Sequence, residues 1–251
     1  MAMDIFVLGV IPARGGSQRI KQKNIAPFAG KPLLGWTVLA ALESGIFTDV
    51  VVSTEDEAIA RTAQEYGASV PFLRREFADD KSPSYLATCE CVSRYEKIVP
   101  HRITYVVQLM ATCPLRTAAD IRNAFDAFLQ TKAPAQISCA RQMGLNSCWS
   151  VTLDANNLPT PFFPETFKKN SQDLPELYCP SGAIWIADKN VLLEKKTFYA
   201  PGHVFYPIPW ISAFDIDTPE ELDIAEKLMF GIQAHSLGCR NMRLNRVPGG
   251  S

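Results

Sequence analysis

An apolar segment gives way abruptly to glycine and positive charge in the stretch Val10-Ile-Pro-Ala-Arg-Gly-Gly-Ser-Gln-Arg-Ile-Lys-Gln-Lys-Asn24. Residues 6–11, which lead into it, are short, apolar and rich in β-branched side chains, which predicts a buried parallel strand. Gly15 and Gly16 can adopt positive φ, so the backbone N–H groups of the following turn could converge on an anion. The stretch therefore indicates a loop that cradles phosphate.

The charges in this loop support a polyanionic ligand. Its cations are Arg14, Arg19, Lys21 and Lys23, with few acidic side chains nearby. The six-residue glycine signature of dinucleotide folds is missing, and Pro32 follows Gly30-Lys31 where a P-loop requires Ser or Thr. Both common phosphate motifs are excluded, and on spacing alone a solvated basic loop remains the alternative.

The rest of the chain alternates strand and helix patterns, which predicts an α/β fold with a mostly parallel sheet. Strands are expected at 49–53, 69–73, 102–110, 135–140, 182–187 and 204–208. Helices are expected at 31–42, from a capping box at Thr54 to Tyr66, at 85–97, at 117–130, and from a cap at Thr218 to about Met229. Ligands of such sheets gather beyond the carboxyl ends of the strands, which is where the loop at 111–116 falls.

Composition narrows the class of protein. The chain has 251 residues, a net charge of -1 and 20% charged residues, so it lacks the overall basicity of a nucleic-acid binder. It shows neither a membrane-spanning apolar run nor a signal-type N-terminus, which predicts a soluble, cytoplasmic protein without membrane contact. Its seven cysteines are scattered and odd in number, which favours reduced thiols over a disulfide framework.

Acidic residues precede the last predicted helix. Asp215 and Asp217 would project to the same side of an extended backbone, giving two hard oxygen ligands that can share Mg²⁺. Taken alone, such residues are more often turn residues. Together with the basic loop, they indicate a metal–triphosphate site.

Several motifs together carry a family resemblance over roughly residues 5 to 230. They are Pro12-Ala-Arg-Gly-Gly-Ser-x-Arg-Ile-x-x-Lys-Asn24, Phe28-x-Gly-Lys-Pro-Leu33, Val51-Val-Ser-Thr-Glu-Asp56, Val70-Pro-Phe-Leu-Arg74, Thr112-x-Pro-Leu-Arg116, Ser171-Gln-Asp-Leu-Pro175, Gly182-Ala-Ile-x-Ile186 and Asp215-Ile-Asp217. The chain resembles the CMP-nonulosonate synthetases, cytidylyltransferases of the acylneuraminate, legionaminate and pseudaminate types. The resemblance implies a Rossmann-like sheet of the nucleotide-diphospho-sugar transferase type.

The resemblance also implies an activity and its site. CTP and a nine-carbon α-keto sugar acid would give a CMP-sugar and pyrophosphate, with Mg²⁺ as cofactor. It assigns catalytic roles to Arg14, Lys23 and Asp217, and Mg²⁺ binding to Asp215 and Asp217. The nucleotide would contact Arg14, Gly15, Gly16, Ser17, Arg19, Lys23, Asn24, Asp80 and Ser84, and the sugar would contact Thr112, Arg116, Gln172, Ser181 and Gly182. The general base is either a metal-bound hydroxide or one of the two aspartates.

Residues 141–180 form a loose stretch that is too long for an ordinary connection. In the family, the corresponding insertion pairs two subunits and lends residues to the neighbour's sugar pocket, which implies a homodimer. We therefore expect one domain over residues 1–230, with 141–180 as the inserted dimerisation segment and 231–251 as a flexible tail.

Three positions depart from the family pattern: Gln18, Met110 and Cys179 stand where a lysine, a glutamine and a basic residue are usual. These departures leave a non-catalytic CTP-binding protein as an alternative. A glycosyltransferase that uses a nucleotide sugar is another, because such an enzyme could bind its metal through an Asp-x-Asp pair. The related keto-deoxyoctonate enzymes carry a Gly-Asp-Glu-Pro pattern that this chain lacks. Motifs in the first half of the chain resemble those of the pseudaminate type, whereas residues 182–186 resemble those of the acylneuraminate and legionaminate types. A legionaminate-like sugar as substrate would be consistent with both resemblances.

Overall fold

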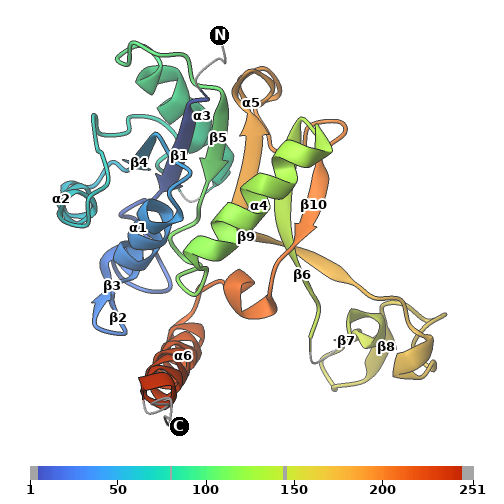
Figure 1. Ribbon diagram of the computed structural model, residues 1–251. Helices are drawn as coiled ribbons and strands as arrows, with labels where there is room; N and C mark the ends of the chain where they lie inside the picture. The colour runs from blue at the N-terminus through green and yellow to red at the C-terminus, as the bar shows by residue number, and fades with distance from the viewer. Residues whose placement is uncertain (1–4, 80, 144–145, 245–251) are drawn as a thin grey trace, which may run out of the picture.

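A six-stranded sheet forms the centre of the computed structural model, which describes residues 5–79, 81–143 and 146–244, with side chains as far as residue 235 (Figure 1). The spatial order is β10-β6-β9-β5-β1-β4. The strands are β1 (Val7–Pro12), β4 (Asp49–Ser53), β5 (Tyr105–Gln108), β6 (Ala135–Arg141), β9 (Tyr178–Asp188) and β10 (Val204–Pro207). Strand β9 runs antiparallel to β5 and β6, and the other neighbours pair in parallel. The predicted α/β fold with a mostly parallel sheet is confirmed.

Helices cover both faces of the sheet because its strands are apolar on both sides. Along β1, Val7 and Ile11 pack on one face and Leu8 and Val10 on the other, as the two-residue period of a strand requires. The first face carries α1 (Leu33–Ser44), α2 (Glu57–Glu65) and α4 (Ala118–Thr131), and the second carries α3 (Ser84–Tyr95) and α5 (Lys189–Lys195). Both faces of the sheet are therefore buried by helices, and the loops that connect strands to helices lie at the carboxyl ends of the strands.

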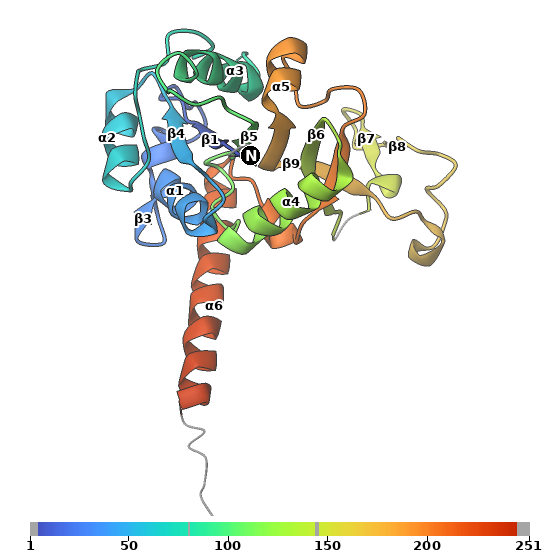
Figure 2. The ribbon, with the colours of Figure 1, turned by 45° about the horizontal axis from the view of Figure 1, so that its top comes forward.

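A third apolar cluster anchors the last helix, α6 (Pro219–Leu244), beside the basic loop. Phe28, from the hairpin of β2 (Pro27–Phe28) and β3 (Lys31–Pro32), packs in it with Ile216 and Ala225. Beyond this cluster α6 extends away from the body as a single rod (Figure 2). The anchoring brings the Asp215–Asp217 segment next to the basic loop, although about two hundred residues separate them in the sequence.

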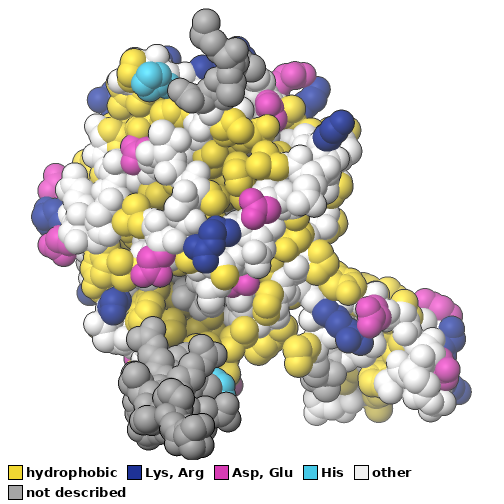
Figure 3. Space-filling model, in the orientation of Figure 1, with side chains coloured by type: hydrophobic (Ala, Val, Ile, Leu, Met, Phe, Trp, Pro, Cys, Tyr) yellow, Lys and Arg dark blue, Asp and Glu magenta, His cyan; other side chains and the backbone are white. Residues whose placement is uncertain are grey.

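The described residues between β6 and β9, 142–143 and 146–177, form a separate lobe. The lobe contains a two-stranded sheet of β7 (Val151–Leu153) and β8 (Pro159–Pro161) and the short 3-10 helices at Ser147–Trp149 and Ser171–Asp173. It projects from the body of the molecule (Figure 3). The lobe lies within residues 141–180, and the role of that segment in dimerisation stays a prediction.

Three predictions about elements were wrong. The N-cap of α2 is Asp56 and not Thr54, because the Asp56 carboxylate accepts hydrogen bonds from the N–H groups of Ala58 and Ile59 at 2.7 and 3.1 Å. The strand expected at 69–73 is a single bridge from Ser69 to Val51, since Pro71 has no N–H to continue the ladder.

Helix α6 is the third correction, because it continues to Leu244 and does not end near Met229. No proline interrupts residues 230–244, and a glycine inside a helix costs only about 1 kcal/mol. Residues 231–244 of the expected tail are therefore helical, whereas 245–251 lie outside the described residues.

Candidate active site

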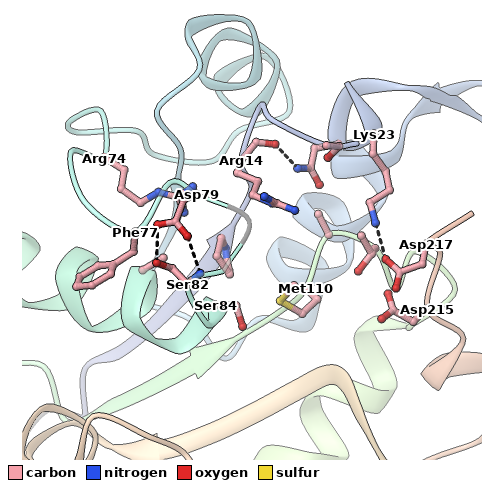
Figure 4. Close-up of a pocket in the computed structure, with 16 residues that line it drawn as sticks. Arg14, Lys23, Arg74, Phe77, Asp79, Ser82, Ser84, Met110, Asp215 and Asp217 are labelled. Carbon is pink, nitrogen blue, oxygen red and sulfur yellow. Dashed lines mark hydrogen bonds and ion pairs between the residues drawn. The ribbon is translucent and has the colours of Figure 1, made fainter. Parts of the chain in front are cut away.

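A polar pocket of about 230 Å³ lies at the carboxyl ends of β1, β4 and β5 (Figure 4). The loop after β1 lines it with Arg14, Ser17, Lys23 and Asn24, and the segment before α6 lines it with Asp215 and Asp217. Its other walls come from the loop before α3, the first turn of α3 and the segment after β5. Their residues are Arg74, Phe77, Asp79, Ser82, Ser84, Ala87, Met110, Ala111 and Thr112. The pocket thus joins the two stretches that the sequence analysis singled out.

The basic loop is held by its own buried amide. Asn24 is 5% exposed, and its Nδ2 donates to the Arg14 carbonyl at 2.8 Å, which closes the loop on itself. A small adjoining cavity of about 70 Å³ is lined by Arg14, Ser17, Gln18, Arg19, Ile20, Lys23 and Asp217. Cationic side chains therefore surround a space large enough for part of a phosphate chain.

The glycines of the loop are needed for a different reason from the expected one. Gly15 and Gly16 are not among the residues with positive φ. A Cβ on Gly15 would lie 2.6 Å from Oδ2 of Asp56, whose other oxygen caps α2. The expected positive φ was wrong, and close packing against the start of α2 requires the glycine at position 15.

Cation and carboxylate meet at the other end of the pocket. Lys23 Nζ donates to Asp217 Oδ1 and to the Ile216 carbonyl, both at 2.8 Å, and Arg19 approaches Asp217 Oδ2 at 3.0 Å. Lys23 is well shielded, with 13% of its side chain exposed. Lys23 therefore fixes the position of Asp217 and faces the pocket at the same time.

The two aspartates have opposite pKa shifts. Burial raises the pKa of Asp215, and the nearby Asp217 charge adds to this, although a hydrogen bond with Thr112 opposes it. Burial also acts to raise the pKa of Asp217, but the hydrogen bonds and charges of Lys23 and Arg19 outweigh it and leave that pKa lowered. Without a metal, Asp217 therefore holds its negative charge more firmly than Asp215 does.

The carboxylate pair fits a Mg²⁺ ion in type, because Mg²⁺ prefers oxygen ligands and is commonly bound by one or two carboxylates plus substrate phosphates. Among the described residues, no cluster of three or more His, Cys, Asp or Glu side chains could hold a metal ion. A metal at Asp215 and Asp217 would therefore need further ligands from phosphate or water.

Several residues proposed from the sequence lie elsewhere. Arg116 is 2% exposed, and its guanidinium donates to the carbonyls of Ala183 and Met110 at 2.6 and 3.3 Å, so it fixes the β5–β9 junction. Burial lowers the pKa of Arg116 to about 10. Ser181 hydrogen-bonds Ser138 across the β6–β9 pair at 2.9 Å, outside the pocket lining.

Ser84 and Thr112 line the pocket, whereas Gly182 and Gln172 lie outside its lining. A Cβ on Gly182 would approach Met110 Cγ to 2.8 Å, so its glycine keeps β9 close to Met110. Gln172 is exposed on the lobe, Cys179 is exposed on β9, and Asp80 lies outside the described residues. Nine members of the sequence-derived site belong to the loop and the segment that the structure brings together, namely Arg14, Gly15, Gly16, Ser17, Arg19, Lys23, Asn24, Asp215 and Asp217.

The sequence analysis missed a carboxylate that links two walls of the pocket. Glu55 Oε1 accepts from the Gly15 N–H and Glu55 Oε2 accepts from Arg74, both at 2.6 Å. Arg74 is 5% exposed and also donates to the Ser53 carbonyl at 3.3 Å. The sequence could have indicated this residue, because Glu55 closely follows the predicted strand at 49–53 and so lies at the edge of the sheet where ligand sites form.

Replacing Glu55 with glutamine, E55Q, is expected to lower the free energy of unfolding by about 2 kcal/mol, because Arg74 stays buried without its counter-charge. For a chain of this size, that corresponds to a fall in melting temperature of roughly 4–8 °C. Thermal unfolding followed by circular dichroism measures it. The matched control is E57Q, since the Glu57 side chain is 77% exposed and pairs with Arg61 at 3.5 Å. Equal melting temperatures for the two variants would contradict the assigned link.

No helix in the described part of the chain is both long and apolar enough to cross a membrane. The cytidylyltransferase family model matches residues 8–240. The chain is 33% identical to the pseudaminic acid cytidylyltransferase of Campylobacter jejuni, over 91% of this chain and 98% of the relative. It is 36% identical to the CMP-N,N'-diacetyllegionaminic acid synthase of Legionella pneumophila, over 89% of this chain and 96% of the relative.

Solved structures show the same fold at lower identity. A CMP-2-keto-3-deoxy-manno-octonic acid synthetase complexed with CTP matches with a TM-score of 0.69 and 16% identity, over 90% of this chain and 99% of that chain. The 4-diphosphocytidyl-2C-methyl-D-erythritol synthase of Anaerococcus prevotii matches with a TM-score of 0.61 and 14% identity, over 90% of this chain and 98% of that chain. The family match and the relatives at or above 30% identity establish that the chain belongs to the cytidylyltransferase family, as a nucleotidyltransferase of the CMP-nonulosonate synthetase type.

Proposed function

We propose that the protein transfers CMP from CTP to a nine-carbon α-keto sugar acid and releases pyrophosphate. The observation that carries this proposal is the meeting of Arg14 and Lys23 with Asp215 and Asp217 in one pocket. A glycosyltransferase would use a nucleotide sugar and release no pyrophosphate, and the family membership does not favour it.

In the proposed reaction, the anomeric hydroxyl of the sugar attacks the α-phosphorus and pyrophosphate leaves. Such transfers depend on positioning and charge neutralisation more than on covalent chemistry. Arg14 and Lys23 would bind the phosphates, with Ser17 and Asn24 beside them. Mg²⁺, bound by Asp215 and Asp217, would supply further charge neutralisation at the phosphate oxygens.

The hydroxyl proton needs an acceptor within the same pocket. We propose that this acceptor is one of the two aspartates or a hydroxide on the metal that they would hold. Without a metal, burial raises the pKa of Asp215 whereas Lys23 and Arg19 lower that of Asp217. A bound Mg²⁺ would lower the pKa of both carboxyl groups.

The lobe is proposed to complete the sugar site of a second subunit. It exposes large apolar side chains that a monomer would leave in water, including Leu153, Leu158 and Phe162, each at least 60% exposed. Gln172 lies on the same lobe, away from the pocket of its own chain. We therefore propose a homodimer in which the lobe, and Gln172 with it, reaches the partner's pocket. We also propose that the reaction takes place in the cytoplasm, where CTP is available.

Pyrophosphate release with CTP and Mg²⁺ tests the activity against N-acetylneuraminic, legionaminic, 8-epi-legionaminic, pseudaminic and keto-deoxyoctonic acids. Turnover of one nine-carbon acid is the expected result and would identify the substrate. Binding of CTP without pyrophosphate from any sugar would overturn the proposal in favour of a non-catalytic CTP-binding protein. Sedimentation of the same sample measures whether the chain is a dimer.

A further inference from the structure

A carboxylate of α6 binds the turn of the β2–β3 hairpin and belongs to none of the roles described above. Glu226 Oε1 accepts from the Ala29 N–H at 2.8 Å, and the two residues lie 197 positions apart. Ala29 is 8% exposed and forms the two-residue turn with Gly30, and their φ angles are 45° and 83°. In such a turn the N–H of the first residue takes no part in the ladder, so it needs a partner elsewhere. Glu226 supplies that partner.

The hairpin has few hydrogen bonds of its own. Pro27 lies opposite Pro32 in the ladder, and neither residue has an N–H to donate. Its position therefore depends on its neighbours, and Phe28 packs against Ile216 in the third apolar cluster, where both are 0% exposed. Apolar packing is non-directional, whereas a hydrogen bond places two particular atoms against each other. The Glu226 contact thus sets the register of α6 along the hairpin.

Each end of this contact is continuous with one half of the active site. Strand β2 begins four residues after Lys23, the cation that bonds to Asp217. Helix α6 begins two residues after Asp217, and Glu221 Oε2 accepts from the Asp217 N–H at 2.8 Å, which ties the aspartate to the helix. The contact between Glu226 and Ala29 therefore joins the element behind Lys23 to the element behind Asp217, at a point outside the pocket lining.

We infer that Glu226 is a positioning residue, which through Ala29 holds Lys23 and Asp217 at the spacing needed to bind a divalent cation together with CTP. The inference rests on the proposed function for the roles of Lys23 and Asp217. In the free protein these two side chains bond directly to each other at 2.8 Å. A bound triphosphate and metal would compete for both groups and weaken that direct link. The contact at Ala29 would then remain as a link between the two halves for which no ligand atom competes.

The test replaces Glu226 with alanine, E226A, which removes the acceptor and suits the interior of a helix. Calorimetric titration of CTP, once with saturating Mg²⁺ and once with EDTA, gives two dissociation constants. With Mg²⁺ we expect E226A to bind CTP about tenfold more weakly, the lower end of the loss that follows removal of an outer partner from a metal site. With EDTA we expect a smaller change, because CTP without a metal has no attraction to Asp217 and the spacing of the two halves matters less.

Two further variants of Glu226 separate the reach of the side chain from its charge. E226Q keeps an oxygen that can accept from the Ala29 N–H, and its affinity for CTP with Mg²⁺ should stay within about twofold of the unmutated value. E226D keeps the charge but is one methylene shorter, and it should behave as E226A does. If E226A does not fold, the comparison of E226D with E226Q carries the test, and equal affinities of these two would overturn the inference.

The variant D188A controls for a loss of stability alone. Asp188 pairs with Tyr105, the first residue of β5, and so lies at the opposite end of the strands from the pocket. Its carboxylate caps α5 by accepting from the N–H groups of Asn190 and Val191 at 2.8 and 3.2 Å. D188A should therefore lower the melting temperature by a few degrees without changing either dissociation constant. An E226A chain that binds CTP with Mg²⁺ as tightly as D188A does would overturn the inference.

The outcomes also separate this inference from the proposed function. An unmutated chain that binds CTP with Mg²⁺ but releases no pyrophosphate with any sugar would overturn the proposed function, and the variants of Glu226 would still decide the inference. An unmutated chain that releases pyrophosphate, with E226A equal to it in affinity for CTP with Mg²⁺, would overturn the inference alone.

Discussion

Replacing Asp217 with asparagine, D217N, is expected to lower kcat by at least about a hundredfold while CTP still binds. Asparagine keeps the shape of the side chain but removes the negative charge that Lys23 and Arg19 hold in the pocket. Asp217 would hold the Mg²⁺ that neutralises charge at the phosphate oxygens, and losing one such electrostatic interaction typically costs a factor of about 10² to 10³ in kcat. Steady-state pyrophosphate release measures kcat, and calorimetry measures the dissociation constant of CTP.

The control for this variant is D223N, which removes a carboxylate of the same type from the exposed face of α6. Asp223 pairs with Lys227 four residues later, and its side chain is 62% exposed. We expect D223N to retain full turnover, because an exposed ion pair of this kind contributes little. Unchanged kcat in D217N would refute the assignment of Asp217 to the reaction.

The variant K23M is expected to weaken CTP binding by about 30-fold or more. Charge-assisted hydrogen bonds are worth about 1.5–3 kcal/mol, which corresponds to a factor of roughly 10 to 150. Lys23 is shielded from solvent, so water screens its attraction to phosphate less than that of an exposed lysine. Calorimetric titration of CTP at fixed ionic strength measures the loss.

The matched control is K21M, in the same loop but exposed and absent from the pocket lining. We expect its dissociation constant for CTP to stay within about twofold of the unmutated value, since an exposed charge contributes little. A K23M chain that binds CTP as tightly as K21M would show that the loop is a solvated basic loop. That was the alternative which the sequence left open.

Local signals in the sequence were sufficient for most of the fold. The apolar run before Pro12, the strand at Asp49–Ser53 and the left-handed Gly45 after α1 are all where the pattern placed them. Each depends on contacts between near neighbours or on burial that a single segment reveals. The strand expected at 69–73 shows where this reasoning failed. A strand continues only while its residues can hydrogen-bond to the neighbouring strand, and Pro71 has no N–H to donate.

The candidate site could be predicted in part for the same reason. Arg14, Lys23 and the aspartate pair stood out because charge is unusual beside a buried strand or before a helix. Arg116 looked equivalent in the sequence, yet it is buried against backbone carbonyls. The sequence does not reveal the direction in which a long side chain points, since that depends on which elements pack around it.

By itself, the sequence determined the order of most strands and helices along the chain, the basic loop, the acidic pair and the family resemblance. Each of these features depends on residues that are close together in the sequence. The tertiary structure decided that Lys23 bonds to Asp217, that Glu55 links Gly15 to Arg74, and that Glu226 reaches Ala29. These contacts join residues that lie 19 to 197 positions apart. Such pairs form only when the packed sheet and helices bring them together, and a hydrogen bond needs its two atoms within about 3 Å.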